Sequence, residues 1–175
     1  MQDVVHTSKS AGFTLVELCL TIVIASILSV SAMGAFQNSG ASQVRGVAEK
    51  ISNDVMYARR LAVQRSGVYN VSFNVANDQY SVNLVNAGTG AETVVTDPYR
   101  QGNFSVTIPA TPGFQNVDLS SANIGGTAKV RFTSQGIPQD ANGNAIAAAG
   151  VITVASGGVT KTIRIEPNTG EVSIQ

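Results

Sequence analysis

The feature that most constrains this chain is an apolar run near its start that begins beside a single carboxylate. From Leu18 to Phe36 there are 19 residues without a charged side chain, and counted from Phe13 the run has 24 residues with Glu17 as its only charged one. A helix rises about 1.5 Å per residue, so about 20 residues cross the hydrocarbon core of a bilayer. The run therefore predicts a transmembrane helix over residues 13–36. Lys9, in the polar segment before it, predicts a cytoplasmic N-terminus.

Glu17 needs a partner if the run lies in a membrane. A carboxylate at membrane depth costs about 2.5 to 3.5 kcal/mol unless it is paired. No basic residue follows it within one helical turn, so the partner must be a new chain terminus or another subunit. The alternative is an ordinary secretory signal peptide cleaved at Val30-Ser31-Ala32, which would release a soluble protein from Met33 onward. That alternative gives Glu17 no role.

The string Gly12-Phe13-Thr14-Leu15-Val16-Glu17-Leu18 resembles the class III signal of type IV pilins and of type II secretion pseudopilins. The resemblance implies that residues 1–12 are a prepilin leader and that a prepilin peptidase cuts between Gly12 and Phe13. It also implies that the new amine of Phe13 is N-methylated. In a filament, the Phe13 ammonium of one subunit would pair with the Glu17 carboxylate of the next, so that Glu17 directs assembly. The expected location is the bacterial inner membrane, crossed once, with the remainder of the chain periplasmic.

The spacing of apolar residues over 37–66 predicts an amphipathic continuation of the helix. Apolar residues recur there at spacings of three and four, which is the pattern of a helix with one buried face; they are Val44, Val47, Ala48, Ile51, Val55, Ala58, Leu61 and Ala62. Polar and basic side chains, Asp54 and Arg59 among them, fall largely elsewhere and predict a solvated face. Ser66-Gly67 predicts the end of the helix.

From residue 67 to 175 the pattern predicts a β-rich head. Alternation with a period of two predicts a hairpin over 68–75 and 79–85 and a second hairpin over 151–155 and 159–165. Shorter strands are predicted at 92–96, 103–108, 114–119, 128–132 and 171–174, with a loop over 138–149. The predicted fold class is α+β: a long N-terminal helix, transmembrane in its lower half and amphipathic in its upper half, packed on antiparallel β-sheets.

The last 50 or so residues resemble the GspH/FimT branch of the pilin-like proteins. The resemblance rests on a strand ending in Phe132, the following Thr-Ser-Gln-Gly, and a return strand at 162–165 that runs into Thr169-Gly170. It implies a minor pseudopilin or minor pilin near the tip of a type II secretion pseudopilus or type IV pilus, priming assembly. The implied partners are other pilins or pseudopilins, the prepilin peptidase and the inner-membrane assembly platform.

A second function implied by the resemblance is DNA capture for DNA uptake, as by some FimT-like proteins. The candidate basic patch is formed by Lys129, Arg131, Lys161 and Arg164. Phosphate binding needs several clustered cations, whereas Glu166 and Glu171 lie close to this patch in sequence, and the whole chain has 11 basic and 11 acidic residues. The sequence therefore favours a structural subunit over a DNA-binding one.

Enzymatic chemistry has few candidate residues here. His6 is the single histidine and Cys19 the single cysteine, so the chain supplies neither a zinc site nor a Ser-His-Asp triad. We predict no catalytic, cofactor-binding or metal-binding residues. Asp97, Asp140 and Asn142 are oxygen ligands of the kind calcium prefers, but carboxylates and amides among glycines are also ordinary turn residues.

Overall fold

The computed structural model describes the backbone of residues 14–175 and the side chains of residues 14–27 and 40–175. The chain divides into two compact units, Met1–Gln37 and Asn38–Gln175. The predicted leader, Gly12 and Phe13 lie outside the described residues, as do the side chains of residues 28–36 of the predicted membrane segment. Among the residues that are described, no helix is both long and apolar enough to cross a membrane.

Helix α1 spans Leu15–Gln64, and its segment in the second unit contributes one face to the core. The eight apolar residues that the helical spacing predicts to be buried are at most 6% exposed: Val44, Val47, Ala48, Ile51, Val55, Ala58, Leu61 and Ala62. The periodicity of the sequence is confirmed here. Asp54 departs from the prediction, since it is buried rather than solvated. Gly46 lies within the helix, where an added Cβ would come 3.1 Å from the Phe114 ring, so its lack of a side chain lets that ring approach closely.

The end of α1 is a Schellman motif, in which the residue after the helix adopts a left-handed conformation. The amide of Gly67 donates to the carbonyl of Ala62 at 3.1 Å, and that of Ser66 donates to Val63 at 3.4 Å. The predicted stop at Ser66-Gly67 is confirmed. However, the left-handed residue is Ser66, with φ +48°, and not the glycine.

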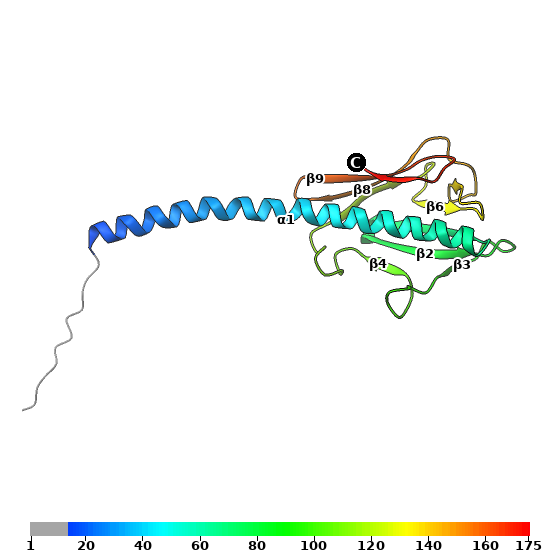
Figure 1. Cartoon of the computed structure of the whole chain (residues 1–175), viewed down its shortest axis with the longest axis horizontal. Coiled ribbons are helices and arrows are strands. Elements are labelled where there is room, and N and C mark those ends of the chain that lie inside the picture. Colours follow the sequence, from blue (N-terminus) through cyan, green and yellow to red (C-terminus); the bar gives the residue numbers. More distant parts are fainter. Residues whose placement is uncertain (1–13) are drawn as a thin grey trace, which may run out of the picture. The chain divides into compact units, whose positions relative to one another are not determined.

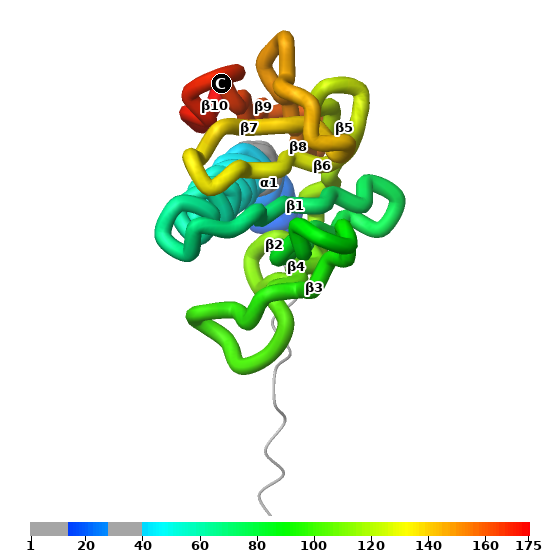
Figure 2. Tube along the Cα trace, turned by 90° about the vertical axis from the view of Figure 1, so that its right-hand side faces the viewer, coloured from blue at the N-terminus to red at the C-terminus, as the bar shows by residue number. Residues whose placement is uncertain are grey.

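The head contains two antiparallel sheets, and Figure 2, which views α1 nearly end on, shows strands of both sheets around the helix. The first sheet has the order β3-β2-β1-β6-β7, with β4 also paired to β2, and the second has the order β10-β9-β8-β5. The strands, several of which are labelled in Figure 1, are β1 Val68–Asn74, β2 Gln79–Val85, β3 Glu92–Val94, β4 Ser105–Thr107, β5 Asp118–Asn123, β6 Lys129–Phe132, β7 Pro138–Gln139, β8 Gly150–Ser156, β9 Val159–Ile165 and β10 Val172–Ile174.

The core lies between α1 and the inner faces of both sheets. Strand β1 contributes Tyr69, Val71 and Phe73, at alternate positions, and β9 contributes Ile163 and Ile165. This alternation is the expected pattern for a sheet with one face covered. The helix packed on antiparallel β-sheets confirms the α+β prediction at this level.

The two predicted hairpins are confirmed, and the shorter strands differ in their limits. Strands β1 and β2 pair from Val68↔Val85 to Asn74↔Gln79, and β8 pairs with β9 from Gly150↔Ile165 to Ser156↔Val159. The strand predicted at 114–119 instead forms at 118–123, and Pro138–Gln139, predicted as a loop, pairs with β6. A short 3-10 helix, η1, spans Val75–Asn77 between the strands of the first hairpin.

Candidate functional site

The first candidate site is the start of α1, where Thr14 precedes the helix. The Thr14 hydroxyl oxygen accepts a hydrogen bond from the Glu17 amide at 3.2 Å, and the Thr14 carbonyl accepts one from the Leu18 amide at 3.1 Å. Threonine followed three residues later by glutamate is the sequence pattern of a capping box. The backbone of Glu17 is thus held by Thr14. Its side chain is exposed and has no ion pair with any described residue, so the carboxylate can accept an external cation.

The four residues of the predicted basic patch are divided between the two sheets. Lys129 and Arg131 lie on β6 of the first sheet, whereas Lys161 and Arg164 lie on β9 of the second. Lys129 Nζ is 2.5 Å from an oxygen of Glu92, and Arg164 Nε is 2.5 Å from an oxygen of Glu166. The hydrogen bond from Arg164 and the negative charge of Glu166 raise the pKa of Arg164. Two of the four cations are therefore neutralised by carboxylates of the head itself.

The candidate calcium ligands lie in two separate turns that use their oxygens internally. Asp140 Oδ1 accepts from the amides of Asn142 and Asn144 at 2.9 and 2.8 Å. The hydrogen bond from the Asn144 amide is the largest cause of a lowered pKa for Asp140. Asp97 Oδ1 accepts from the amides of Tyr99 and Arg100. Within the described part of the chain, no group of three or more His, Cys, Asp or Glu side chains is placed to hold a metal ion.

A polar hollow of about 530 Å³ lies against α1 and includes Tyr99, which is 89% exposed. Beside it, the hydroxyl of Tyr80 donates to Asp54 Oδ2 at 2.5 Å, and Lys50 Nζ is 3.0 Å from the same oxygen. Burial is the largest cause that raises the pKa of Tyr80 well above its ordinary value, and the charge of Asp54 adds to it. This network joins β2 to α1.

Arg59 is a structural residue that sequence reasoning missed, because its basic character suggested a solvated face. Its Nε donates to the carbonyl of Gly136 at 3.1 Å. A Cβ on Gly170 would come 2.9 Å from that same carbonyl oxygen and 3.1 Å from Arg59 Nε. Both glycines belong to the segments that carry the GspH/FimT resemblance. The turns at Gly136 and Gly170 thus meet at the Arg59 side chain of α1. No local sequence pattern predicts this contact.

A helix at the start of the chain, buried along one face by antiparallel sheets that follow it, defines a pilin-like α+β fold. In particular, the fold is similar to that of the minor pseudopilin EpsH from the type 2 secretion system of Vibrio cholerae. That structure has 11% sequence identity and a TM-score of 0.56, over 76% of this chain and 96% of EpsH. It is also similar to the type IV minor pilin FimU of Pseudomonas aeruginosa, with 15% identity and a TM-score of 0.50 over 77% of this chain and 89% of FimU. No protein-family model and no curated protein sequence matches the chain.

Proposed function

We propose that this chain is a minor pseudopilin or minor pilin, a structural subunit of a type II secretion pseudopilus or a type IV pilus. The observation that carries the proposal is the fold shared with EpsH and FimU, which are subunits of these two kinds of system by their names. The string from Gly12 to Leu18 supports it independently, because it runs into the start of α1 at Leu15. By the GspH/FimT resemblance of the last 50 or so residues, the subunit is near the filament tip and primes assembly.

The proposal gives each part of the chain a role. Residues 1–12 are a leader that the prepilin peptidase removes, Phe13 is the N-methylated mature terminus, and 13–36 is the transmembrane and assembly segment. Residues 37–66 are the amphipathic part of the helix, and 67–175 are the periplasmic head. The protein crosses the bacterial inner membrane once and meets the assembly platform and other pilins there. The apolar run from Leu18 to Phe36 supports the anchor.

Glu17 acts in assembly by pairing with the Phe13 ammonium of the neighbouring subunit. Support comes from the capping contact, in which Thr14 binds the Glu17 amide and leaves the carboxylate exposed. Pairing in the membrane offsets about 2.5 to 3.5 kcal/mol of the cost of a lone carboxylate there. A subunit in the correct register therefore gains free energy that a misaligned subunit does not.

The test is Glu17→Ala, measured as the amount of the subunit in sheared filaments relative to the amount in the inner membrane. We expect normal cleavage and membrane insertion but at least about tenfold less incorporation, since each 1.4 kcal/mol is about a factor of ten. Glu171→Ala, which removes an exposed carboxylate from the head, is the matched control and should be incorporated normally. Normal incorporation of Glu17→Ala would refute the assembly role.

DNA capture is the competing proposal, and the carboxylate partners of Lys129 and Arg164 count against it. Nucleic-acid binding draws its affinity from several unpaired cations acting together. Those pairs reduce the local charge on both sheets. The structural subunit is accordingly the function we favour.

A further inference from the structure

The face of the first sheet that points away from α1 carries a cluster of polar side chains. Side chains alternate along a strand, so when Val71 and Val130 face the core, their neighbours face outward. On β1, β2 and β6 these outward residues include Asn70, Asn83 and Arg131. In the register of the sheet, Asn70 lies opposite Asn83 on one side and opposite Arg131 on the other.

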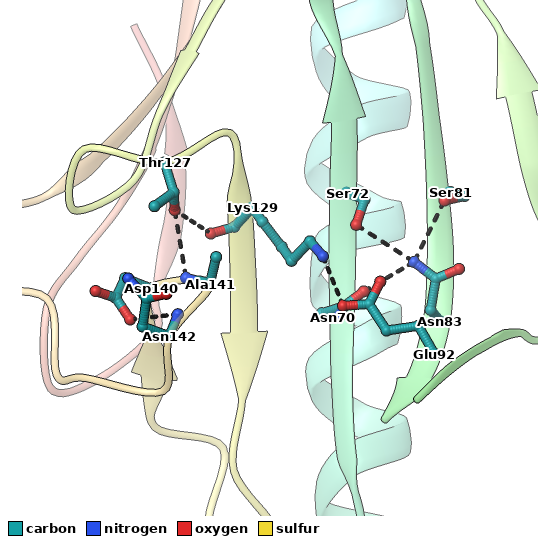
Figure 3. A network of polar contacts seen from close by, with 10 residues as sticks. All are labelled: Asn70, Ser72, Ser81, Asn83, Glu92, Thr127, Lys129, Asp140, Ala141 and Asn142. Carbon is teal, nitrogen blue, oxygen red and sulfur yellow. Dashed lines mark hydrogen bonds and ion pairs between the residues drawn. The ribbon is translucent and has the colours of Figure 1, made fainter. Parts of the chain in front are cut away.

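Hydrogen bonding in this cluster leaves two donors without acceptors. Asn83 Nδ2 donates to Asn70 Oδ1 at 2.8 Å and lies 3.3 Å from Ser81 Oγ, as Figure 3 shows. Asn70 is fully buried, yet its own Nδ2 has no partner, and neither has the buried Nε of Arg131 on the adjacent strand. Buried donors are nearly always satisfied, because leaving one unpaired is costly. Two neighbouring orphan donors indicate a missing acceptor.

The charges around the cluster indicate that this acceptor is an anion. Lys129 and Glu92 form an ion pair beside Asn70 in Figure 3 and cancel one another. Arg131 has no ion pair among the described residues, which leaves one uncompensated positive charge. Its guanidinium lies near Gly143, where an added Cβ would be 3.5 Å from Nη1. Asp140 of that loop is committed to Asn142 and Asn144.

We propose that Arg131 and Asn70 form a docking site for the side-chain carboxylate of an aspartate or glutamate on a neighbouring protein subunit. A carboxylate bound side-on to a guanidinium uses Nε and one terminal nitrogen, and Asn70 Nδ2 donates to the same group. The Lys129–Glu92 pair, with side-chain exposures of 26% and 34%, moves aside when the carboxylate enters. That the neighbour is a filament subunit rests on the function proposed above.

A protein carboxylate fits this site better than a nucleic-acid backbone does. One unpaired cation matches one acidic side chain, whereas a backbone of phosphates is bound by several cations together. The two donors lie on adjacent strands: the neutral side-chain amide of Asn70 and the charged guanidinium of Arg131. They suit the two oxygens of a single carboxylate.

The test is an NMR titration of the ¹⁵N-labelled full-length chain in detergent micelles. The probe is the blocked peptide acetyl-Gly-Glu-Gly-amide, and its control is the same peptide with glutamine. We expect the glutamate peptide, and not the glutamine peptide, to shift the Arg131 Nε–H and Asn70 Nδ2–H₂ signals. Arg131→Gln should weaken binding at least about tenfold, and Arg131→Lys should also weaken it because lysine lacks the side-on pair of donors.

Lys161→Gln is the matched variant, since it removes one positive charge from the other sheet and should bind the peptide as the wild type does. Equal shifts with both peptides, no shift with either, or shifts with duplex DNA or inorganic phosphate alone would overturn the proposal. If Arg131→Gln does not fold, the comparison of the two peptides on the wild type still decides. The titration needs no filament, so its failure leaves the proposed function standing. Conversely, failure of the Glu17→Ala test would remove only the identity of the partner.

Discussion

At the scale of single residues, the link between Tyr80 and Asp54 shows how a polar contact can hold two elements together inside an apolar core. Tyr80 is 2% exposed and Asp54 is 7% exposed, and their hydrogen bond joins β2 to α1. A buried phenol bonded to a carboxylate resists ionisation, which is why its pKa is raised. The contact therefore has a pH dependence of known sign.

We predict that the free energy of unfolding falls as the pH rises above about 10. Tyrosine in the unfolded chain loses its proton near pH 10, whereas folded Tyr80 keeps it at higher pH. The stabilisation is thus complete below the unfolded pKa and is lost as the pH approaches the folded one. Urea unfolding at pH 8 and pH 11 should show a smaller fall for Tyr80→Phe than for the wild type. That variant should also lose about 1.5 to 3 kcal/mol at pH 8.

Tyr99→Phe is the control for this experiment, since it removes the hydroxyl of a tyrosine that is 89% exposed and lies outside the Tyr80–Asp54 hydrogen bond. It should therefore reproduce the wild-type fall. The interpretation would be wrong if Tyr80→Phe showed the same fall between pH 8 and pH 11 as the wild type.

For Ser66 we predict a substitution that raises the free energy of unfolding. It holds φ +48° at the end of α1, a conformation that costs residues with a Cβ about 1 to 2 kcal/mol. Ser66→Gly removes that cost but raises the conformational entropy of the unfolded chain. We therefore expect a net increase of about 0.5 to 1 kcal/mol in the free energy of unfolding, measured in urea. Ser66→Ala keeps the Cβ and should give no gain. Equal stabilisation by both variants would contradict the argument.

At the scale of elements, the parts of the fold that were predicted are those with a local signal. The buried face of α1 and the hairpin of β1 and β2 follow from residue spacing alone. Strand β5 did not, because the apolar Phe114 and Val117 drew the predicted strand toward 114–119. In the structure Phe114 packs near Gly46, and the polar segment Asp118–Asn123 pairs with β8 instead. A strand that forms because it pairs with a segment distant in sequence has little local sequence signal of its own.

The junction of α1 with the two turns at Gly136 and Gly170 can be tested with a single substitution. Gly170→Ala adds a Cβ at φ +63° and 2.9 Å from the Gly136 carbonyl oxygen. Gly158→Ala adds one at φ +82° with nothing within 4 Å. The first variant carries both the backbone cost and the overlap, and the second carries only the backbone cost of about 1 to 2 kcal/mol.

We therefore expect Gly170→Ala to lower the free energy of unfolding by about 1 to 3 kcal/mol more than Gly158→Ala does, because overpacking adds about that amount. Urea unfolding of both variants beside the wild type measures the difference. Equal losses would show that the approach of Gly170 to Arg59 and Gly136 does not contribute to stability.

At the scale of the whole molecule, the candidate sites differ in whether they could be predicted from the sequence. The Gly12–Glu17 motif is a continuous string, so it was found from sequence, and its chemistry remains a proposal because Phe13 lies outside the described residues. The Asn70–Arg131 cluster joins residues 61 positions apart and exists only through the register of β1 and β6. The pairing of Lys129 with Glu92 likewise joins residues that are distant in sequence, 37 positions apart. Such sites need the structure.

The central claim, that this chain is a processed filament subunit, is tested most directly by the mass of its mature N-terminus. The protein is purified from membranes of the cells that produce it, digested, and its N-terminal peptide sequenced by mass spectrometry. We predict a chain that begins at Phe13 and carries one methyl group on its amine, and a Gly12→Val variant that keeps the leader. A chain that begins at Met33 would mean an ordinary signal peptide and a released protein, and would contradict the account.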